Sequence, residues 1–222
     1  MVDKLKEAII LSGGEGWRLK PYEWMPKPLL KINEQTLIDL QISWLRTNGF
    51  KNIIVASNRD DLTSLPVEYS FEKTKLGTGG ATNEAFKKIK GDVAYVMNVD
   101  DIVFYNPSEL FEYASNGAGV LLAKPRLPFG RVTLRNGTRV VRFEHRSYLD
   151  FYVSAGHHVF KKEIVQRFFP EKGDFEFSTM QRLADSGLLQ GYTYHGMWLT
   201  INTMKDLIDA RAYLKYEHRK YE

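Results

Sequence analysis

The feature that most constrains the fold of this chain is a short apolar run that leads directly into a glycine-rich turn. Residues 8–11 are apolar and have the length of a buried strand. Three glycines follow within four positions, at 13, 14 and 16. Gly permits sharp bends that bring backbone N–H groups close to an anion. Because the cations Arg18 and Lys27 come next, this stretch predicts a polyphosphate site at the end of a strand.

Strand-like and helix-like segments alternate through the first half of the chain. The expected strands are 8–11, 52–56, 66–71, 93–97 and 119–123, and the expected helices are 36–47, 79–88 and 107–116. Asn48 and Gly49 provide a helix stop, and Pro107 suits the first turn of a helix. This alternation predicts parallel βαβ units and an α/β fold.

The second half of the chain has a more antiparallel character. Asn136 and Gly137 separate two strand-like segments, 131–134 and 140–143, which predicts a hairpin. Further on, strands are expected at 151–160 and 188–194, and helices at 176–186 and 204–216. Since no linker or repeat interrupts the sequence, we expect one domain over residues 1–222, with a Rossmann-like, mostly parallel mixed sheet and a smaller antiparallel lobe.

Composition excludes several classes of protein. The chain has no cysteine, which removes disulfides, thiolate metal sites and cysteine nucleophiles. The net charge of +4 is spread along the sequence and forms no basic stripe, so we expect no nucleic-acid partner. No apolar run has the length of a membrane span, and the apolar patch near the N-terminus is too short for a signal peptide. A cytoplasmic protein without a membrane partner is expected.

The glycine turn matches neither of two common nucleotide motifs. No Gly-Lys-Ser/Thr follows it, and Leu19 occupies the third glycine position of a dinucleotide fingerprint. The stretch instead resembles the signature of the sugar-phosphate nucleotidyltransferases, also called nucleoside-diphosphate-sugar pyrophosphorylases. Their pattern of Gly-Gly-x-Gly-x-Arg-Leu, Pro and Pro-Lys-Pro is met by Gly13, Gly14, Gly16, Arg18, Leu19, Pro21, Pro26, Lys27 and Pro28.

This resemblance implies nucleotidyl transfer from a nucleoside triphosphate to a sugar 1-phosphate. An oxygen of the sugar phosphate attacks the α-phosphorus, so no protein nucleophile is needed, and catalysis consists of positioning anions and neutralising their charge. Arg18 is expected to bind the leaving pyrophosphate and Lys27 to lie near the α-phosphate. The implied division is a nucleotide-binding lobe over 1–124 and a sugar-phosphate-binding lobe with the C-terminal helix over 125–222.

The resemblance also implies Mg²⁺. Asp100 and Asp101 follow the expected strand 93–97, at the end where open α/β sheets place ligands. Asp100 matches the metal-binding Asp of the family's Asn-Gly-Asp, with Val99 in place of Gly. Where the family often carries a second metal-binding Asp, this chain has Thr200. Three alternatives follow from the missing carboxylate at position 200. Asp101 or Glu176 supplies a carboxylate to the metal instead, or the triphosphate and water complete the metal coordination, or activity is impaired.

The family's substrate contacts carry over to further positions. The nucleotide is expected at Leu11, Ser12, Gly13, Gly14, Gly16, Leu76, Gly77, Thr78 and Gly79, because the segment 76–81 resembles the family's base-contacting loop. The neighbouring Glu72 and Lys73 are left undecided. The sugar phosphate is expected at Gly130, Glu144, His145 and Gly156, where the match is looser: His145 replaces a Lys, with Arg146 beside it.

Two functions remain from the sequence. The first is an active Mg²⁺-dependent enzyme that takes a nucleoside triphosphate and a sugar 1-phosphate. Segment 76–81 resembles members that use GTP with mannose- or heptose-type 1-phosphates. The second is a catalytically degenerate relative that binds a nucleotide or nucleotide sugar as a regulatory or partner subunit, which the changes at Thr200 and His145 would suit. The base, the sugar and the oligomeric state, including a homo-oligomer, are left open.

Overall fold

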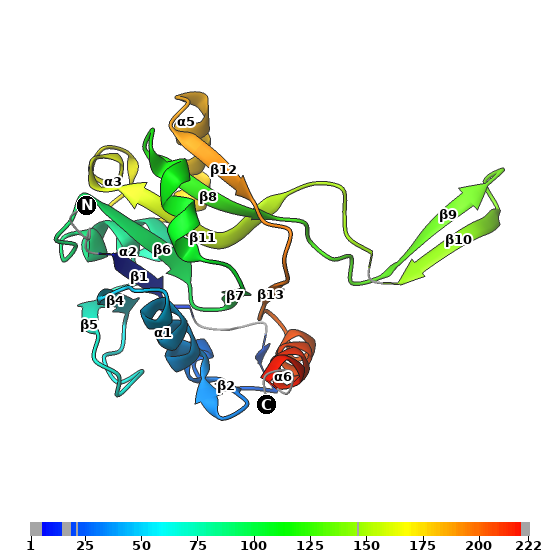
Figure 1. The fold of residues 1–222 in the computed structure, drawn as a ribbon, viewed down its shortest axis with the longest axis horizontal. Helices are drawn as coiled ribbons and strands as arrows, with labels where there is room; N and C mark the ends of the chain where they lie inside the picture. Colours follow the sequence, from blue (N-terminus) through cyan, green and yellow to red (C-terminus); the bar gives the residue numbers. More distant parts are fainter. Residues whose placement is uncertain (1–5, 15–18, 21, 146, 219–222) are drawn as a thin grey trace.

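A seven-stranded mixed sheet forms the centre of the computed structural model, which describes residues 6–14, 19–20, 22–145 and 147–218 (Figure 1). Its order is β12-β8-β11-β6-β1-β4-β5. The strands are β1 (Glu7–Leu11), β4 (Asn52–Ser57), β5 (Glu68–Phe71), β6 (Val93–Asn98), β8 (Ala118–Ala123), β11 (Val153–Lys161) and β12 (Leu189–Thr193). Neighbours pair in parallel except at β11, which is antiparallel to both β6 and β8. The predicted α/β fold with a mostly parallel sheet is confirmed.

Helices cover both faces of this sheet, which is why its central strands are almost continuously apolar. Ile10 faces a core cluster shared with α1 (Leu37–Thr47) and α6 (Met204–His218). Ile9 faces a second cluster shared with α2 (Gly77–Phe86) and α3 (Lys162–Phe168). Successive side chains of β1 therefore pack against the helices on opposite faces of the sheet, and all five positions of the strand are buried.

Most of the predicted helices are confirmed. In α1 the side chain of Thr36 caps the first turn by accepting a hydrogen bond from the Asp39 N–H at 3.2 Å. Two predictions were wrong in detail: residues 107–116 form a 3₁₀ helix, η3 (Pro107–Ala114), and residues 176–186 form two short helices, α4 (Phe175–Ser178) and α5 (Met180–Asp185). Within the described residues, no helix combines the length and the apolar character needed to cross a membrane.

Several short elements were not predicted. The 3₁₀ helix η2 (Lys27–Leu29) and the strand pair β2 (Lys31–Ile32) and β3 (Gln35–Thr36) connect β1 to α1. β7 (Asp101–Val103) pairs antiparallel with β13 (Trp198–Thr200), and this pairing sets Asp101 opposite Thr200. The strands β7 and β13 bring the end of the chain back to the turn that follows β6.

A two-stranded arm, formed by β9 (Gly130–Arg135) and β10 (Arg139–His145), projects away from the body of the molecule (Figure 1). It is the predicted hairpin around Asn136 and Gly137, both of which have positive φ. Cross-strand pairing places apolar residues on one face and arginines on the other. Among the described residues, no buried hydrophobic core residue falls between Ala123 and Ala155, so the arm lies outside the core.

Candidate active site

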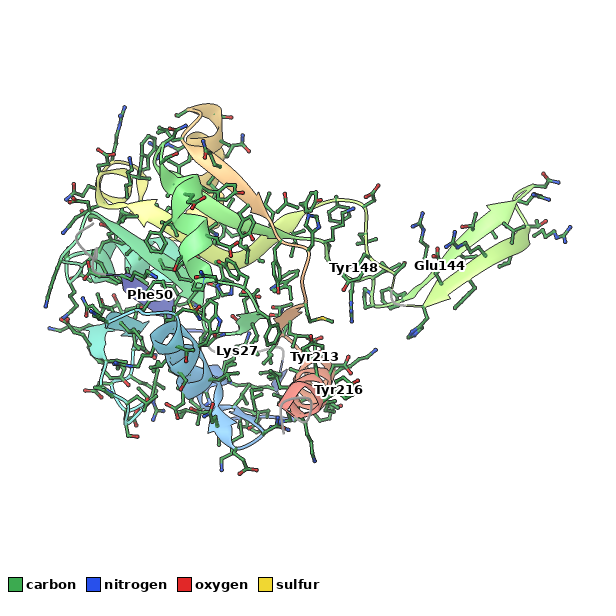
Figure 2. All side chains as sticks on the ribbon, viewed as in Figure 1. Lys27, Phe50, Glu144, Tyr148, Tyr213 and Tyr216 are labelled. Atoms are coloured by element: carbon green, nitrogen blue, oxygen red, sulfur yellow. The ribbon has the colours of Figure 1, made fainter. Side chains whose placement is uncertain are left out.

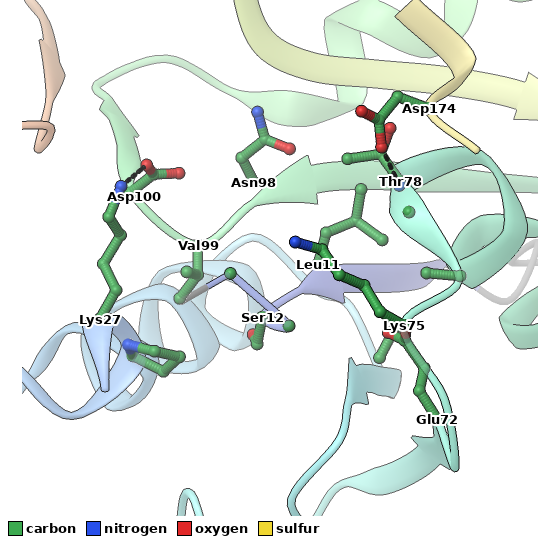
Figure 3. Close-up of a pocket in the computed structure, with 16 residues that line it drawn as sticks. Leu11, Ser12, Lys27, Glu72, Lys75, Thr78, Asn98, Val99, Asp100 and Asp174 are labelled. Carbon is green, nitrogen blue, oxygen red and sulfur yellow. Dashed lines mark hydrogen bonds and ion pairs between the residues drawn. The ribbon is translucent and has the colours of Figure 1, made fainter. Parts of the chain in front are cut away.

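A cavity of about 320 Å³ opens over the carboxyl ends of β6, β1, β4 and β5. Parallel strands carry ligands at this edge of an open α/β sheet. The lining comes from strand ends, from the turns that follow them and from the start of α2: Leu11, Ser12, Gly13, Gly14, Lys27, Pro28, Ala56, Glu72, Lys75, Gly77, Thr78, Ala81, Asn98, Val99, Asp100 and Asp174 (Figure 3).

The glycine turn enters this cavity directly from β1. The Ser12 N–H donates to the Ala56 carbonyl at 2.9 Å, which continues the pairing of β1 with β4 by one residue. At Gly13, a Cβ atom would lie 3.2 Å from Oε1 of Glu72, so a side chain there would crowd that carboxylate. Ser12, Gly13 and Gly14 line the cavity as the motif predicts, whereas the predicted Gly16 and Arg18 lie outside the described residues.

An ion pair marks one end of the cavity. Nζ of Lys27 lies 2.5 Å from Oδ2 of Asp100, and both side chains are largely buried. Lys27 comes from η2 and Asp100 from the turn after β6, which are 73 residues apart in sequence. The pair therefore sets a cation, which can neutralise phosphate charge, next to a carboxylate, which can hold a divalent ion.

The turn that carries Asp100 is held from three directions. The Gln41 side chain, buried on α1, donates to the carbonyls of Val99 at 3.1 Å and Asp101 at 2.8 Å. The Ile201 N–H donates to the carbonyl of Asp100 at 3.0 Å. Nε2 of His157 lies 3.0 Å from the Asp101 carbonyl, so that nitrogen carries the proton. These bonds fix the backbone on both sides of the Asp100 carboxylate.

Asp101 points away from the cavity into the protein. Its Oδ1 accepts from Nε1 of Trp198 at 2.9 Å and its Oδ2 from Nδ2 of Asn98 at 3.1 Å. Burial raises the pKa of Asp101 to about 7, and the charge of Asp100 adds to this rise. Gly156 lies against the same carboxylate, since a Cβ atom there would come within 1.9 Å of Oδ2.

Among the described residues, three carboxylates line the cavity, those of Glu72, Asp100 and Asp174, and Asp100 is the one paired with Lys27. Mg²⁺ is usually bound by one or two carboxylates together with phosphate oxygens and water. Asp100 meets that demand, because it borders the cavity beside the glycine turn. No cluster of three or more acidic or histidine side chains in the described part of the chain forms a metal site by itself. Any metal here would depend on oxygens of the substrate.

The start of α2 differs from the expected base-contacting loop. We expected glycines followed by a helix from residue 79, but the helix begins at Gly77. Its glycines admit a neighbouring segment: a Cβ atom at Gly79 would lie 2.7 Å from the Gly173 carbonyl, and one at Gly80 would lie 2.4 Å from the Glu171 carbonyl. Gly77 and Thr78 line the cavity, and Leu76 and Gly79 do not.

Four polar residues of the cavity lining were not assigned to the site from the sequence. Glu72 was left undecided, and Lys75, Asn98 and Asp174 were not singled out. The Asp174 carboxylate accepts from the Thr78 N–H at 3.0 Å across 96 residues of sequence. Asn98 is the last residue of β6 and matches the Asn of the family's Asn-Gly-Asp, and these two signals could have placed it in the site.

The residues expected to bind the sugar phosphate are not brought to this cavity. Gly130, Glu144 and His145 lie on the arm, and Figure 2 shows Glu144 on the arm, well away from Lys27. Glu144 pairs with Arg142 at 2.8 Å. Gly156 lies on β11 behind Asp101. A role for these four positions in sugar binding stays a prediction.

A second cavity, of about 580 Å³, lies between the base of the arm and α6. It is lined by Lys124, Pro125, Arg126, Leu127, Pro128, Tyr148, Met197, Trp198, Leu199, Thr200, Lys205, Asp206, Asp209, Ala212, Tyr213 and Tyr216. Trp198 connects the two cavities, because its indole borders this one and donates to Asp101 behind the first. The mixture of aromatic rings, cations and carboxylates suits a polar ligand with an anionic group.

Comparison with known proteins agrees with this geometry. A sequence model of the family described as nucleotidyl transferase matches residues 7–217. The chain belongs to this family. It is 30% identical to the D-glycero-alpha-D-manno-heptose 1-phosphate guanylyltransferase of Campylobacter jejuni over 77% of this chain and 83% of that protein. It is 25% identical to the mannose-1-phosphate guanyltransferase of Aspergillus oryzae, over 92% of this chain and 63% of the relative.

Solved structures of other proteins share the fold of this nucleotidyl transferase family member. HddC from Yersinia pseudotuberculosis superimposes with a TM-score of 0.73 at 20% identity, covering 95% of this chain and 100% of that one. The same protein complexed with GMP-PN gives a TM-score of 0.72. At this level of identity the likeness supports the fold, including the open sheet whose strand ends form the cavity.

Proposed function

We propose that this nucleotidyl transferase family member transfers a guanylyl group from GTP to a sugar 1-phosphate of the mannose or heptose type. The observation that carries the proposal is the Lys27–Asp100 pair beside the glycine turn, in a cavity over the ends of parallel strands. The named activities of the Campylobacter jejuni and Aspergillus oryzae relatives support the choice of GTP and of these sugars. GTP is a cytoplasmic metabolite, so we place the reaction in the cytoplasm.

In this proposal a phosphate oxygen of the sugar 1-phosphate attacks the α-phosphorus of GTP. The bond from that phosphorus to the oxygen bridging to the β-phosphate breaks, and pyrophosphate leaves with the electron pair. A guanosine-diphosphate sugar is the second product. Lys27 reduces the repulsion between the two reacting phosphates. Backbone N–H groups of Gly13 and Gly14 hold the triphosphate beside Ser12, and Arg18 binds the departing pyrophosphate.

Mg²⁺ is the divalent ion that we propose, with Asp100 as its protein ligand and phosphate oxygens completing the coordination. When bound, it supplies positive charge to the phosphate oxygens. Asp101, which we also predicted as a ligand, accepts hydrogen bonds from the Trp198 and Asn98 side chains in this structure. Nucleotide contacts at Leu11, Gly16, Leu76, Gly77, Thr78 and Gly79, and sugar-phosphate contacts at Gly130, Glu144, His145 and Gly156, remain part of the proposal.

The test is pyrophosphate release by the purified protein. GTP, ATP, UTP, CTP and dTTP are each incubated with mannose 1-phosphate, a heptose 1-phosphate or glucose 1-phosphate, with Mg²⁺ or with a chelator. We expect release with GTP and a mannose- or heptose-type acceptor in the presence of Mg²⁺, and none with the chelator. Nucleotide binding without release from any pair would instead support a degenerate binding subunit.

A further inference from the structure

The arm formed by β9 and β10 has an apolar face that is exposed to solvent. Across the two strands, Leu134 pairs with Val140. Val132 pairs in the same way with Phe143, so all four side chains share one face. Val140 and Phe143 are three residues apart, and the register shift between Val140 and Arg142 supplies the extra residue that keeps both on that face. Each of the four residues is between 44% and 67% exposed, although their pattern is that of a strand with one buried face.

Packing within the arm fixes the shape of this face. The Phe143 ring lies over Gly130, where an added Cβ atom would come within 2.4 Å of the ring. An aromatic ring over a strand glycine helps to hold the register of a hairpin. Six of the seventeen large apolar side chains that are exposed in the described part of the chain fall within residues 129–143. Exposed apolar groups that gather in one place mark an interaction surface.

The size of this surface suits a weak, reversible interface. The four side chains and the neighbouring Phe129 and Val141 expose on the order of 600 Å², at about 100 Å² each. Two arms packed face to face would remove roughly 1,000 Å² from water, which is at the lower end of the range for specific interfaces. An isolated two-stranded hairpin is marginally stable, and further strands packed on its apolar face stabilise it. A second arm would supply those strands.

The opposite face of the arm is basic. It carries Arg131, Arg135, Arg139 and Arg142, which together with Glu144 give residues 129–145 a net charge of +3. The net charge of the whole chain is +4, so most of it lies on the arm and is not spread evenly as we expected.

The two faces together decide between possible partners. If the apolar face lay on a membrane, the arginines would be on the water side, away from the anionic headgroups. If the apolar face lay on the same face of a second arm, both sets of arginines would remain in water, on the outside of the pair. The second arrangement buries the apolar side chains without placing the arginines close to each other.

We infer that the apolar face of the arm is a dimer contact, which a second copy of this chain covers with the same face of its own arm. The contact is isologous, with the same residues on both sides of a two-fold axis. The two arms pack as aligned sheets about 10 Å apart. Because each arm projects away from its own body, the two cavities over the strand ends stay separate (Figure 1). This inference does not depend on the proposed reaction.

Sedimentation velocity of the 222-residue chain over a range of concentrations is the first test. An interface of this size predicts a monomer–dimer equilibrium with a Kd of roughly 1–100 μM. Leu134→Ser should raise this Kd at least ~10-fold, because it removes an apolar side chain from the centre of the contact. Val132→Ser, on the same strand and the same face, should do the same. Arg139→Ser is the matched control on the opposite face and should keep the dimer.

Salt and a distance measurement identify which face is in contact. Raising the ionic strength to about 0.5 M screens the repulsion between two arms of like charge, so it should strengthen the dimer. The chain has no cysteine, so Thr133→Cys allows one nitroxide label on the arginine face of each arm. Double electron–electron resonance should then give an intermolecular distance below roughly 40 Å, as expected for short ribbons about 10 Å apart.

Four outcomes would overturn the inference. The first is a chain that stays monomeric at every concentration, and the second is a dimer whose labels lie beyond the expected distance. The third is a dimer that salt or Arg139→Ser dissociates, which would assign the contact to the arginine face. The fourth is a monomeric protein that sediments with anionic phospholipid vesicles and loses this binding in Leu134→Ser, which would assign the apolar face to a membrane.

Discussion

Lys27 is the residue whose loss should most affect the proposed reaction. We expect Lys27→Ala to lower kcat at least ~100-fold, because removing one group that stabilises transition-state charge typically has an effect of that size. The measurement is pyrophosphate release at saturating GTP and sugar 1-phosphate. Lys31→Ala is the matched control, since that side chain is exposed on the neighbouring strand β2. A Lys27→Ala enzyme with near-normal kcat would show that Lys27 has another role.

A second prediction for a single residue concerns the stability of the variant Gly156→Ala. Its φ of +75° and the 1.9 Å approach to Asp101 make Ala unfavourable for two reasons. Gly187 has a φ of +67° with open space around it, so Gly187→Ala isolates the backbone cost of about 1–2 kcal/mol. Gly156→Ala should lower the free energy of unfolding by a further ~1–3 kcal/mol through crowding. Urea denaturation measures both, and equal losses would exclude the clash.

The sequence predicted part of the site because some contacts are local to a motif. The glycine turn, Lys27 and Asp100 are each read from neighbouring residues and from their position after an apolar strand. The burial of Asp101 was not predictable, because it depends on Trp198, which is 97 residues away. Asp174 likewise reaches Thr78 only through the packing of the 170–174 segment against α2.

At the scale of elements, β11 should make stability depend on pH. His158 lies in this central strand, stacked on Phe160 with Phe175 edge-on to it. Burial lowers the pKa of His158 to about 3, and the neighbouring His157 contributes to this shift. A depressed pKa favours the neutral folded form, so its stabilising contribution is present above pH 6.5 and is lost as the pH falls towards 3. Between pH 7 and 5 the loss is roughly 2 kcal/mol.

His158→Phe should remove that dependence while it retains the aromatic packing. Urea unfolding of both proteins at pH 7 and pH 5 measures the effect. The wild type should lose more free energy of unfolding between these pH values than the variant, by the amount given above. Parallel losses in the two proteins would mean that the imidazole of His158 does not titrate in this way.

Elements with a clear hydrophobic pattern in the sequence were predicted well. Elements that form only through contacts with distant parts of the chain were not. Apolar runs in the sequence predict the buried strands. An amphipathic pattern that begins after a capping residue predicts α1. β7 and β13 have three residues each and exist because they pair with one another. The expected helix over 176–186 is divided at Thr179, whose hydroxyl is buried and donates to the Phe168 carbonyl at 3.0 Å.

At the scale of the molecule, the arm should be dispensable for folding. An isolated two-stranded hairpin contributes little stability by itself. Its stem is closed by bonds from the Leu127 N–H to the Ser147 carbonyl and from the Leu149 N–H to the Pro125 carbonyl, both at 2.9 Å. Replacing residues 129–146 with a short glycine-serine linker should therefore leave the thermal unfolding midpoint within a few degrees of wild type.

The same deletion tests the predicted sugar contacts on the arm. If Gly130, Glu144 and His145 contribute to binding, the KM for sugar 1-phosphate should rise while the Kd for GTP stays unchanged. A cooperative unfolding transition in circular dichroism verifies that the shortened protein is folded. An unchanged KM would remove these three residues from the site.

The position of β11 has a consequence for how the chain assembles during synthesis. β11 separates β8 from β6 in the sheet, although both of those strands precede it in the sequence. A nascent chain that ends at residue 124 can align β6, β1, β4 and β5, but β8 then has neither of its partners. Only after residue 161 emerges can β11 pair with β6, the edge strand of this partial sheet, and offer its other side to β8. The pairing of β8 with strands much later in the sequence is long-range, and long-range pairing slows folding. The strand ends beneath the nucleotide cavity can therefore align before the rest of the sheet is complete.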